Sequence, residues 1–134
     1  MKKKVLCLGL ALLLLLMMAI PSYADSHAQE PSRQAVGSCS MSISGHSITI
    51  MGRSLSSYDE DTIRVSVNLW ELRDGKWYRI TNSTAELSNA RTVSTSKTVT
   101  VTGGYYYKVT ASHYSCTNGV SYNCTSYTSQ TWVA

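Results

Sequence analysis

The chain has 134 residues and a formal net charge of +4, from 12 Lys and Arg residues against 8 Asp and Glu residues. Three of the lysines lie in the first four residues, and every acidic residue lies beyond Ala24. Without residues 1–24 the count is nine basic against eight acidic residues, a net charge of +1. This balance argues against a nucleic-acid-binding face, and the remaining length suits one domain with one core.

Residues 1–24 have the three parts of a secretory signal peptide. Basic residues Lys2–Lys4 come first, an apolar run from Val5 to Ile20 follows, and Ser22 and Ala24 supply small side chains before the expected cleavage site. The apolar run is shorter than the ~20 residues of a spanning helix. We therefore expect an exported protein, secreted or associated with the cell surface, whose mature chain has no integral membrane segment.

The mature chain divides into a linker and a domain. Residues 25–38 are polar and lack apolar periodicity, which predicts a flexible N-terminal linker. Residues 39–134 alternate with a period of two almost throughout, and no window has a helical stripe. We predict one all-β domain, an antiparallel immunoglobulin-like or fibronectin type III-like sandwich of seven or eight short strands. A small closed barrel is the alternative.

The first three strands are indicated by alternation alone. Strands over 39–43 and 48–51 flank a turn at Ser44-Gly45-His46. The third strand has the clearest pattern, because apolar residues at 63, 65, 67 and 69 alternate with polar ones. After it, an Asp-Gly pair at 74–75 favours a two-residue hairpin. In that register Leu72 faces Trp77 and Leu69 faces Ile80.

The second half of the domain has a weaker pattern at first. The Ser-, Thr- and Asn-rich stretch from 81 to 96 predicts a poorly formed edge strand with loops, held by Leu87 and Val93. A turn at Gly103-Gly104 then leads into a long strand with an inward set from Tyr105 to Ala111. A last strand is expected from Val120 to Trp132.

Three cysteines remain in the mature chain, Cys39, Cys116 and Cys124. An odd number in an exported protein leaves one thiol either free or available for an intermolecular bond, and hence for a dimer. Cys116 with Cys124 closes the shortest loop and is the favoured disulfide, with Cys39–Cys124 as the alternative.

The favoured disulfide depends on the turn between its two cysteines. A two-residue turn at Asn118-Gly119 places Cys116 opposite Ser121 and Cys124 opposite His113, on different faces. That register forbids the bond. A wider loop, centred near residue 120, would set the two cysteines against each other.

Two resemblances bear on the fold. The run from Val99 to Ala111 resembles the passage between strands E and F of fibronectin type III domains. There Tyr105 or Tyr107 would pack its ring in the core and return its hydroxyl to the backbone.

A second resemblance covers most of residues 38–127. The segments 39–45, 61–70, 75–77, 104–109 and 125–127 are similar to those of a family of small secreted proteins from Gram-positive, largely spore-forming bacteria. This resemblance implies a one-domain secreted β protein and supplies no catalytic residue.

No catalytic or metal-binding motif accompanies these strands. His27, His46 and His113 are not at metal-ligand spacing, and no Gly-x-Ser-x-Gly elbow occurs. The acidic run 59–61 fits a solvated loop better than a Ca²⁺ site, because three consecutive carboxylates do not point at one ion. His113 is expected to be an inward or rim residue of a strand. We therefore expect no cofactor, no metal site and no enzymatic activity.

The aromatic residues carry the functional hypothesis. Trp70 alternates with the core set of the third strand, so Trp70 and Tyr106 are expected on the wet face, with Trp77 beside them. Such rings form a platform for sugar rings of a cell-wall glycan or for a surface protein, although rim packing would also explain them. The sequence thus favours a non-enzymatic binding or interaction module with an unknown ligand. The alternatives are a self-associating surface protein and, less favoured, a secreted enzyme or inhibitor.

Overall fold

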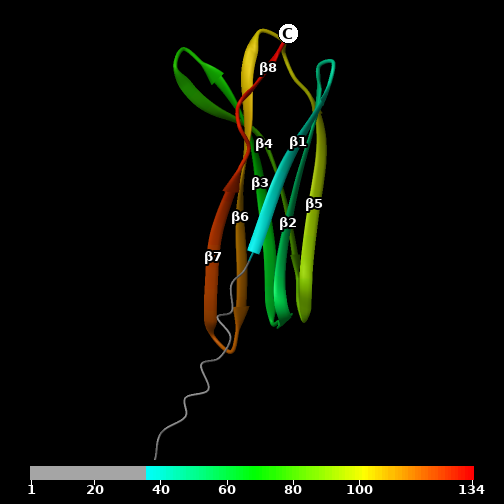
Figure 1. Ribbon diagram of the computed structural model, residues 1–134, viewed down its shortest axis with the longest axis vertical. Coiled ribbons are helices and arrows are strands. Elements are labelled where there is room, and N and C mark those ends of the chain that lie inside the picture. Colours follow the sequence, from blue (N-terminus) through cyan, green and yellow to red (C-terminus); the bar gives the residue numbers. More distant parts are fainter. Residues whose placement is uncertain (1–35) are drawn as a thin grey trace, which may run out of the picture. The chain divides into compact units, whose positions relative to one another are not determined.

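A computed structural model describes residues 36–134 as eight strands (Figure 1). The predicted signal peptide and residues 25–35 of the predicted linker lie outside the described residues. The strands are β1 (Val36–Ser44), β2 (Ser47–Glu60), β3 (Thr62–Arg73), β4 (Lys76–Leu87), β5 (Ala90–Thr100), β6 (Tyr105–Thr117), β7 (Val120–Tyr127) and β8 (Thr131–Val133). Within this part of the chain there is no helix long and apolar enough to cross a membrane.

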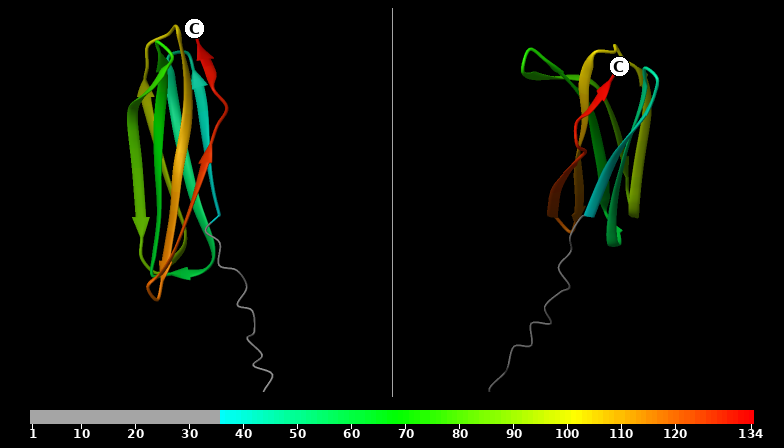
Figure 2. Two further views of the ribbon diagram at one scale, coloured as in Figure 1. Left: turned by 90° about the vertical axis from the view of Figure 1, so that its left-hand side faces the viewer. Right: turned by 45° about the horizontal axis from the view of Figure 1, so that its top comes forward.

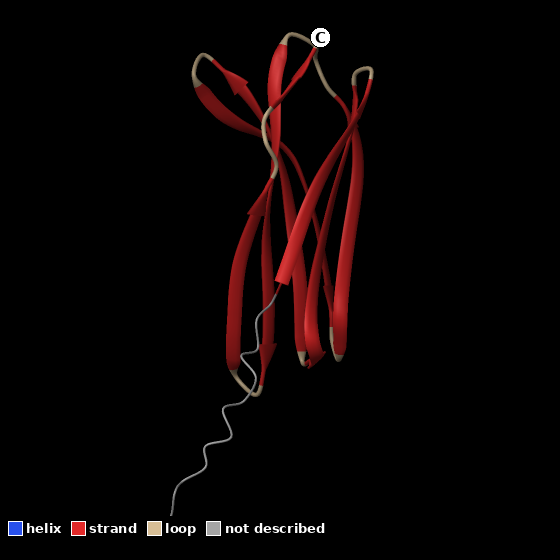
Figure 3. Ribbon diagram, viewed as in Figure 1, coloured by secondary structure: helices blue, strands red, loops and turns tan. Residues whose placement is uncertain are grey.

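The strands form two antiparallel sheets, which confirms the all-β prediction and the number of strands. One sheet has the order β1-β2-β5, and the other has the order β4-β3-β6-β7, with β8 also paired to β6. Short turns join them (Figure 3), and the tip of the β3–β4 hairpin leans away from the other strands (Figures 1 and 2). The strands are longer than predicted, since β2 has 14 residues and β6 has 13.

β1 begins inside the predicted linker. Gly37 and Ser38 already pair with Ser54 and Arg53 of β2, so the first strand starts at Val36 and not at residue 39. The backbone hydrogen bonds of an adjacent strand thus order a segment that has no apolar periodicity of its own.

The core lies between the sheets. β3 contributes the inward row that its alternation predicted, β6 adds a second row beside it, and β2 and β5 of the other sheet cover both. The buried apolar residues are Ile48, Ile50, Ile63, Val65, Val67, Leu69, Val93, Val101, Tyr107, Val109, Ala111 and Val133. Tyr107 takes the position expected of a tyrosine with a buried ring. Its hydroxyl lies 2.6 Å from the Thr102 carbonyl oxygen and 2.6 Å from Glu71 Oε2, and burial raises its pKa.

Two glycines allow the sheets to approach closely. A Cβ atom on Gly52 would lie 2.2 Å from Cγ2 of Val67, and one on Gly37 would lie 2.0 Å from the His113 ring. Both distances are far below van der Waals contact. The backbones of β1 and β2 therefore lie directly on side chains of the opposite sheet.

The predicted hairpin at 74–75 is confirmed, with one change of register. Asp74 and Gly75 both have positive φ, and Leu72 pairs with Trp77 as expected. The predicted Leu69–Ile80 pair is wrong, because a β-bulge at Leu69/Trp70 pairs Leu69 with Thr81. The bulge adds one residue to β4 and directs Ile80 against the core.

The Ser- and Thr-rich stretch 81–96 was predicted to be a poorly formed edge strand with loops. The edge position is confirmed, because β4 and β5 are both edge strands, but the stretch consists of regular strand with one short turn. It contains the second half of β4 and the first half of β5. Side-chain hydroxyls bond this stretch to other strands. Ser66 Oγ of β3 lies 2.9 Å from Thr84 Oγ1 of β4 in the same sheet, and Ser83 Oγ of β4 lies 2.6 Å from Thr95 Oγ1 of β5 in the other sheet. Cross-strand hydroxyl pairs stabilise a sheet with few apolar side chains, which an apolar pattern does not detect. Leu87, one of the two expected anchors, is half exposed.

The last strand is interrupted. β7 ends at Tyr127 and β8 begins at Thr131, where a single strand to Trp132 was expected. Thr128 causes the break, because its backbone N–H donates to the Val109 carbonyl and its hydroxyl accepts from the Val109 N–H.

Candidate functional site

One row of apolar and aromatic side chains crosses four strands on the outer face of the larger sheet. Trp77 of β4 lies opposite Leu72 of β3, Leu72 lies opposite Tyr106 of β6, and Tyr106 lies opposite Trp132 of β8. Residues directly opposite one another in antiparallel strands share a face. Tyr107 and Glu71, the inward neighbours of this row, are buried, so the row faces away from the core.

A second row lies beside the first. Trp70 is opposite both Arg79 of β4 and Lys108 of β6. Tyr127 of β7, opposite Thr110, extends the same face. We call these residues together the aromatic surface: Trp70, Leu72, Trp77, Arg79, Tyr106, Lys108, Tyr127 and Trp132.

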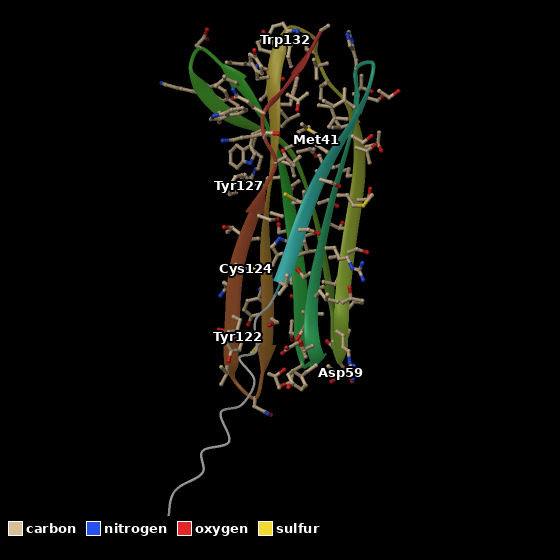
Figure 4. All side chains as sticks on the ribbon, viewed as in Figure 1. Met41, Asp59, Tyr122, Cys124, Tyr127 and Trp132 are labelled. Atoms are coloured by element: carbon tan, nitrogen blue, oxygen red, sulfur yellow. The ribbon has the colours of Figure 1, made fainter. Side chains whose placement is uncertain are left out.

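Two of the rings are strongly exposed and in contact. Tyr106 and Trp132 have ring centroids 5.1 Å apart at 65°, an edge-to-face arrangement. They are 40% and 52% exposed, and Tyr127 is 81% exposed (Figure 4). Edge-to-face contact holds both rings in a fixed relation without covering them.

Trp70 is partly buried and held by a hydrogen bond. Its indole Nε1 donates to Thr110 Oγ1 at 2.8 Å, which links β3 to β6 on the outer face. The ring therefore keeps one orientation, so little conformational entropy would be lost when a ligand contacts it.

The ring of Trp77 is in contact with a cationic side chain. The Lys108 ammonium lies 4.1 Å from its ring centroid, a cation–π contact. Trp77 thus combines with Lys108 into a site that is both aromatic and cationic, whereas the sequence prediction named aromatic residues alone.

The break between β7 and β8 brings Trp132 to this surface. β7 pairs Tyr127 with Thr110, and the same register carried further would set Thr131 opposite Tyr106. The observed partner of Tyr106 is Trp132, one residue later. A one-residue bulge of this kind re-aims the side chains that follow it.

The three aromatic residues that the sequence selected, Trp70, Tyr106 and Trp77, lie together on this surface. Sequence reasoning missed Trp132, because its face depends on the extra residue between β7 and β8. It also missed Arg79 and Lys108, although the Asp-Gly turn fixes Arg79 opposite Trp70 and could have identified it.

The predicted disulfides are not present, because the two-residue turn forms instead. Asn118 and Gly119 have positive φ, Cys116 lies opposite Ser121, and Cys124 lies opposite His113. The two cysteines point to different faces of β7 and β6, and no disulfide joins any of the three described cysteines.

The alternative bond, Cys39–Cys124, is also not formed. The Cys39 thiol lies against the Val109 carbonyl, whereas the Cys124 thiol contacts the backbone of Gly37. Burial raises the pKa of the Cys124 thiol, which lowers its reactivity as a thiolate.

His113 is an inward residue, fully buried between the sheets. Its Nδ1 lies 2.9 Å from Ser54 Oγ and its Nε2 lies 2.8 Å from Ser126 Oγ. Ser54 donates its single hydroxyl hydrogen to the Arg64 carbonyl. Nδ1 therefore carries the ring proton and donates to Ser54, and Nε2 accepts from Ser126.

This arrangement does not suit nucleophilic catalysis. A general base must accept the proton of its serine, yet the nitrogen that faces Ser54 is already protonated. Ser54 and His113 are both fully buried, so a substrate does not reach them. Burial lowers the pKa of His113, which keeps the ring neutral in the folded protein.

The acidic run 59–61 is not a solvated loop. Asp59 pairs with Arg91, Glu60 is buried and accepts hydrogen bonds from Ser56 and Thr117, and Asp61 accepts from the Asn118 N–H. The three carboxylates face three different partners. Among residues 36–134 no group of three or more His, Cys, Asp or Glu side chains could hold a metal ion.

Two hollows in the surface lie away from the aromatic surface. They are formed by β1 and β2, and their lining includes Val36, Ser38, Ser40, Met51 and Arg53. The side chains around them are mainly serines and aliphatic groups, with Arg53 as the one ionisable group apart from the Cys39 thiol.

No protein-family model matches the chain, and no curated protein matches its sequence. Solved structures with some similarity include CsgH of R. palustris, with a TM-score of 0.40 and 13% identity over 67% of this chain and 90% of that one. Spo0M, a sporulation control protein from Bacillus subtilis, has a TM-score of 0.41 and 10% identity over 74% of this chain and 49% of that one.

A third solved structure is the E. coli curli protein CsgC, with a TM-score of 0.39 and 12% identity over 70% of this chain and 97% of that one. At these scores the likeness assigns neither a role nor a residue to the present chain.

Proposed function

We propose that the protein is a secreted, non-enzymatic binding module that acts outside the cell or at its surface and contacts its ligand through the aromatic surface. In this proposal the signal peptide 1–24 is removed, and the remaining chain is an immunoglobulin-like or fibronectin type III-like sandwich. The observation that carries the proposal is the row Trp77, Leu72, Tyr106 and Trp132 across four strands.

The geometry of this row supports a binding role. Its rings are large and are held by an edge-to-face contact between Tyr106 and Trp132 and a cation–π contact between Lys108 and Trp77. In the second row, Trp70 is held by a hydrogen bond to Thr110. Aromatic side chains held in this way offer contact area at low entropic cost and have polar edges for hydrogen bonds. The row lies on the outer face of a sheet, which suits an extended sugar polymer better than a small molecule that needs an enclosing pocket.

Self-association is the second candidate, because the same exposed rings could pack against another copy of the chain, or an unpaired cysteine could link two chains. Measuring molar mass in solution, with and without reductant, separates the two. A monomer in both conditions supports ligand binding, and a stable dimer that buries Trp132 supports self-association.

Binding to purified peptidoglycan and to a panel of polysaccharides tests the proposal, with Trp fluorescence recorded in parallel. We expect saturable binding with a changed Trp signal, lost in a Tyr106→Ala/Trp132→Ala double variant and weakened in Trp70→Ala. Tyr78→Ala is the matched control, because Tyr78 is 48% exposed but lies opposite Glu71, so its side chain points to the other face. Equal loss in the control would overturn the assignment to this surface.

A further inference from the structure

We propose that the ligand of the aromatic surface is an acidic glycan, a sugar polymer with carboxylate or phosphate groups, bound by Arg79 and Lys108 on either side of Trp70. This inference rests on the proposed function and adds the chemical class of the ligand. The positive charge of the aromatic surface is the observation that supports this inference.

The two cationic residues lie on the strands on either side of Trp70. Trp70 lies opposite Arg79 on β4 and opposite Lys108 on β6, so the three side chains form one row on the same face. Lys108 is held over Trp77 at 4.1 Å, which fixes its ammonium beside the first row. The Lys108 side chain thus reaches from β6 across β3 to Trp77 of β4, the strand that also holds Arg79. A planar guanidinium and an ammonium on the same face as these indoles can each bond an anionic group of a polymer that lies on the rings.

Neither cation is neutralised by a carboxylate. The ion pairs of the described residues are Arg64–Glu86, Arg73–Glu71 and Arg91–Asp59, and Arg79 and Lys108 take part in none of them. The Arg79 side chain is exposed and makes no hydrogen bond within residues 36–134. An unpaired cation on an aromatic face is a binding group that the fold itself does not use.

The described carboxylates lie elsewhere. Glu71 faces inward to Tyr107, Glu86 pairs with Arg64 further down the sheet, and residues 59–61 lie at the opposite end of the sandwich (Figure 4, Asp59). Asp74 is at the hairpin turn beyond the row. The aromatic surface is therefore positive, although residues 36–134 together hold eight basic and six acidic side chains, a net charge of only +2.

This combination favours a sugar polymer over the other anionic polymers. A net charge of +2 is too low for general nucleic-acid binding. An extended acidic peptide would add to a sheet edge through its backbone, whereas the side chains of this surface lie on the face of a sheet. The row spans three strand intervals, roughly 14 Å, over which flat sugar rings can stack on the aromatic groups while their acidic substituents reach the cations.

Three cellulose derivatives with one backbone test the inference: carboxymethyl cellulose, cellulose phosphate and neutral hydroxyethyl cellulose. We expect the secreted chain to bind the two charged polymers and to release them as salt is raised. Arg79→Gln and Lys108→Gln should each weaken this binding by about three- to tenfold. The phosphate and carboxylate arms show which acidic group is preferred.

Lys97→Gln is the matched control, because it removes the same charge from β5 of the other sheet and should leave binding unchanged. Equal binding of neutral and charged cellulose, still lost in Tyr106→Ala/Trp132→Ala, would overturn the acidic ligand and leave the proposed function standing. Binding of polyglutamate as strong as that of the charged cellulose derivatives would overturn the assignment of the ligand as a sugar polymer. Absence of binding to every sugar polymer would count against both proposals.

Discussion

The two ends of the sandwich interior are built from different chemistry. Near the β1–β2 turn, the inward side chains of β2 and β6 are Ile48, Ile50, Tyr107 and Val109. Towards the opposite end the same two strands place Ser54, Ser56, His113 and Ser115 inside. The inward side chains of β3, in contrast, form an apolar row that continues from one end towards the other. The comparison shows that the same two strands can contribute apolar side chains to the core at one end and hydrogen-bonded polar side chains at the other, within one fold.

The two ends should respond differently to substitution. At the apolar end the free energy of unfolding depends on buried area and packing, so the loss follows the volume removed. At the polar end it depends on whether each buried group has a partner. Glu60, for example, accepts from Ser56 and Thr117 at 2.5 Å each.

The largest effect is expected at the apolar row. Leu69→Ala removes a fully buried side chain and should lower the free energy of unfolding by about 3 kcal/mol, measured by urea denaturation. Leu87→Ala is the control, because Leu87 is 50% exposed and should change stability by less than about 0.5 kcal/mol. Equal losses in both variants would contradict the described burial.

The next effect concerns the contact between the sheets at the polar end. Gly37→Ala places a methyl group where the His113 ring lies and should destabilise the protein by about 1–3 kcal/mol through overpacking. Ser40→Ala, on the exposed side of β1, is the matched control. Gly45→Ala would not serve, because the positive φ of Gly45 makes any substitution there strained. A Gly37→Ala variant as stable as Ser40→Ala would show that β1 does not lie on His113.

A smaller effect is expected from pH. Burial lowers the pKa of His113 below its ordinary value of 6.5, so the unfolded chain takes up the proton first as the pH falls. The contribution of the neutral ring is thus fully present above pH ~6.5 and is lost progressively below it, towards the lower pKa of the folded state. Urea midpoints from neutral to mildly acidic pH measure this slope. The slope should disappear in His113→Gln, and its persistence there would assign it to other groups.

The smallest effect should have the opposite sign. Ser115 Oγ is buried and, within the described residues, has no hydrogen-bond partner. Ser115→Ala removes an unsatisfied hydroxyl and should be neutral or stabilising by up to about 1 kcal/mol. Ser54→Ala, which removes the partner of both His113 and Arg64, should be destabilising under the same conditions. If Ser115→Ala destabilised as much as Ser54→Ala, the hydroxyl of Ser115 would have a partner after all.

The sequence predicted the parts of the fold that depend on apolar alternation and turn chemistry. The strand over 63–69, the Asp74-Gly75 hairpin and the inward set of β6 were all found in this way. The stretch 81–96 was not, because its strands are stabilised by hydroxyl pairs between Ser and Thr residues. A pattern of apolar side chains contains no information about such pairs.

For the candidate site too, the sequence predicted the residues that depend on strand periodicity and turn register, and missed those that depend on bulges. Trp70 and Tyr106 follow from the two-residue period of their strands, and Trp77 from the hairpin register. Trp132 and the Leu69–Thr81 pairing depend on bulges, which shift register by one residue and leave no mark in the composition. The disulfide prediction was wrong for a related reason, because loop length favoured the Cys116–Cys124 bond and the two-residue turn opposed it.

The interruption between β7 and β8 makes the aromatic surface depend on the number of residues between 127 and 131 as well as on their identity. Insertion of a single residue there, with the pairing of β8 to β6 otherwise unchanged, would bring Thr131 to Tyr106 and turn the indole of Trp132 to the other face, with every aromatic residue still present in the sequence. In related chains, an insertion or deletion in this short segment should therefore be a better indicator of altered binding than a substitution within the strands.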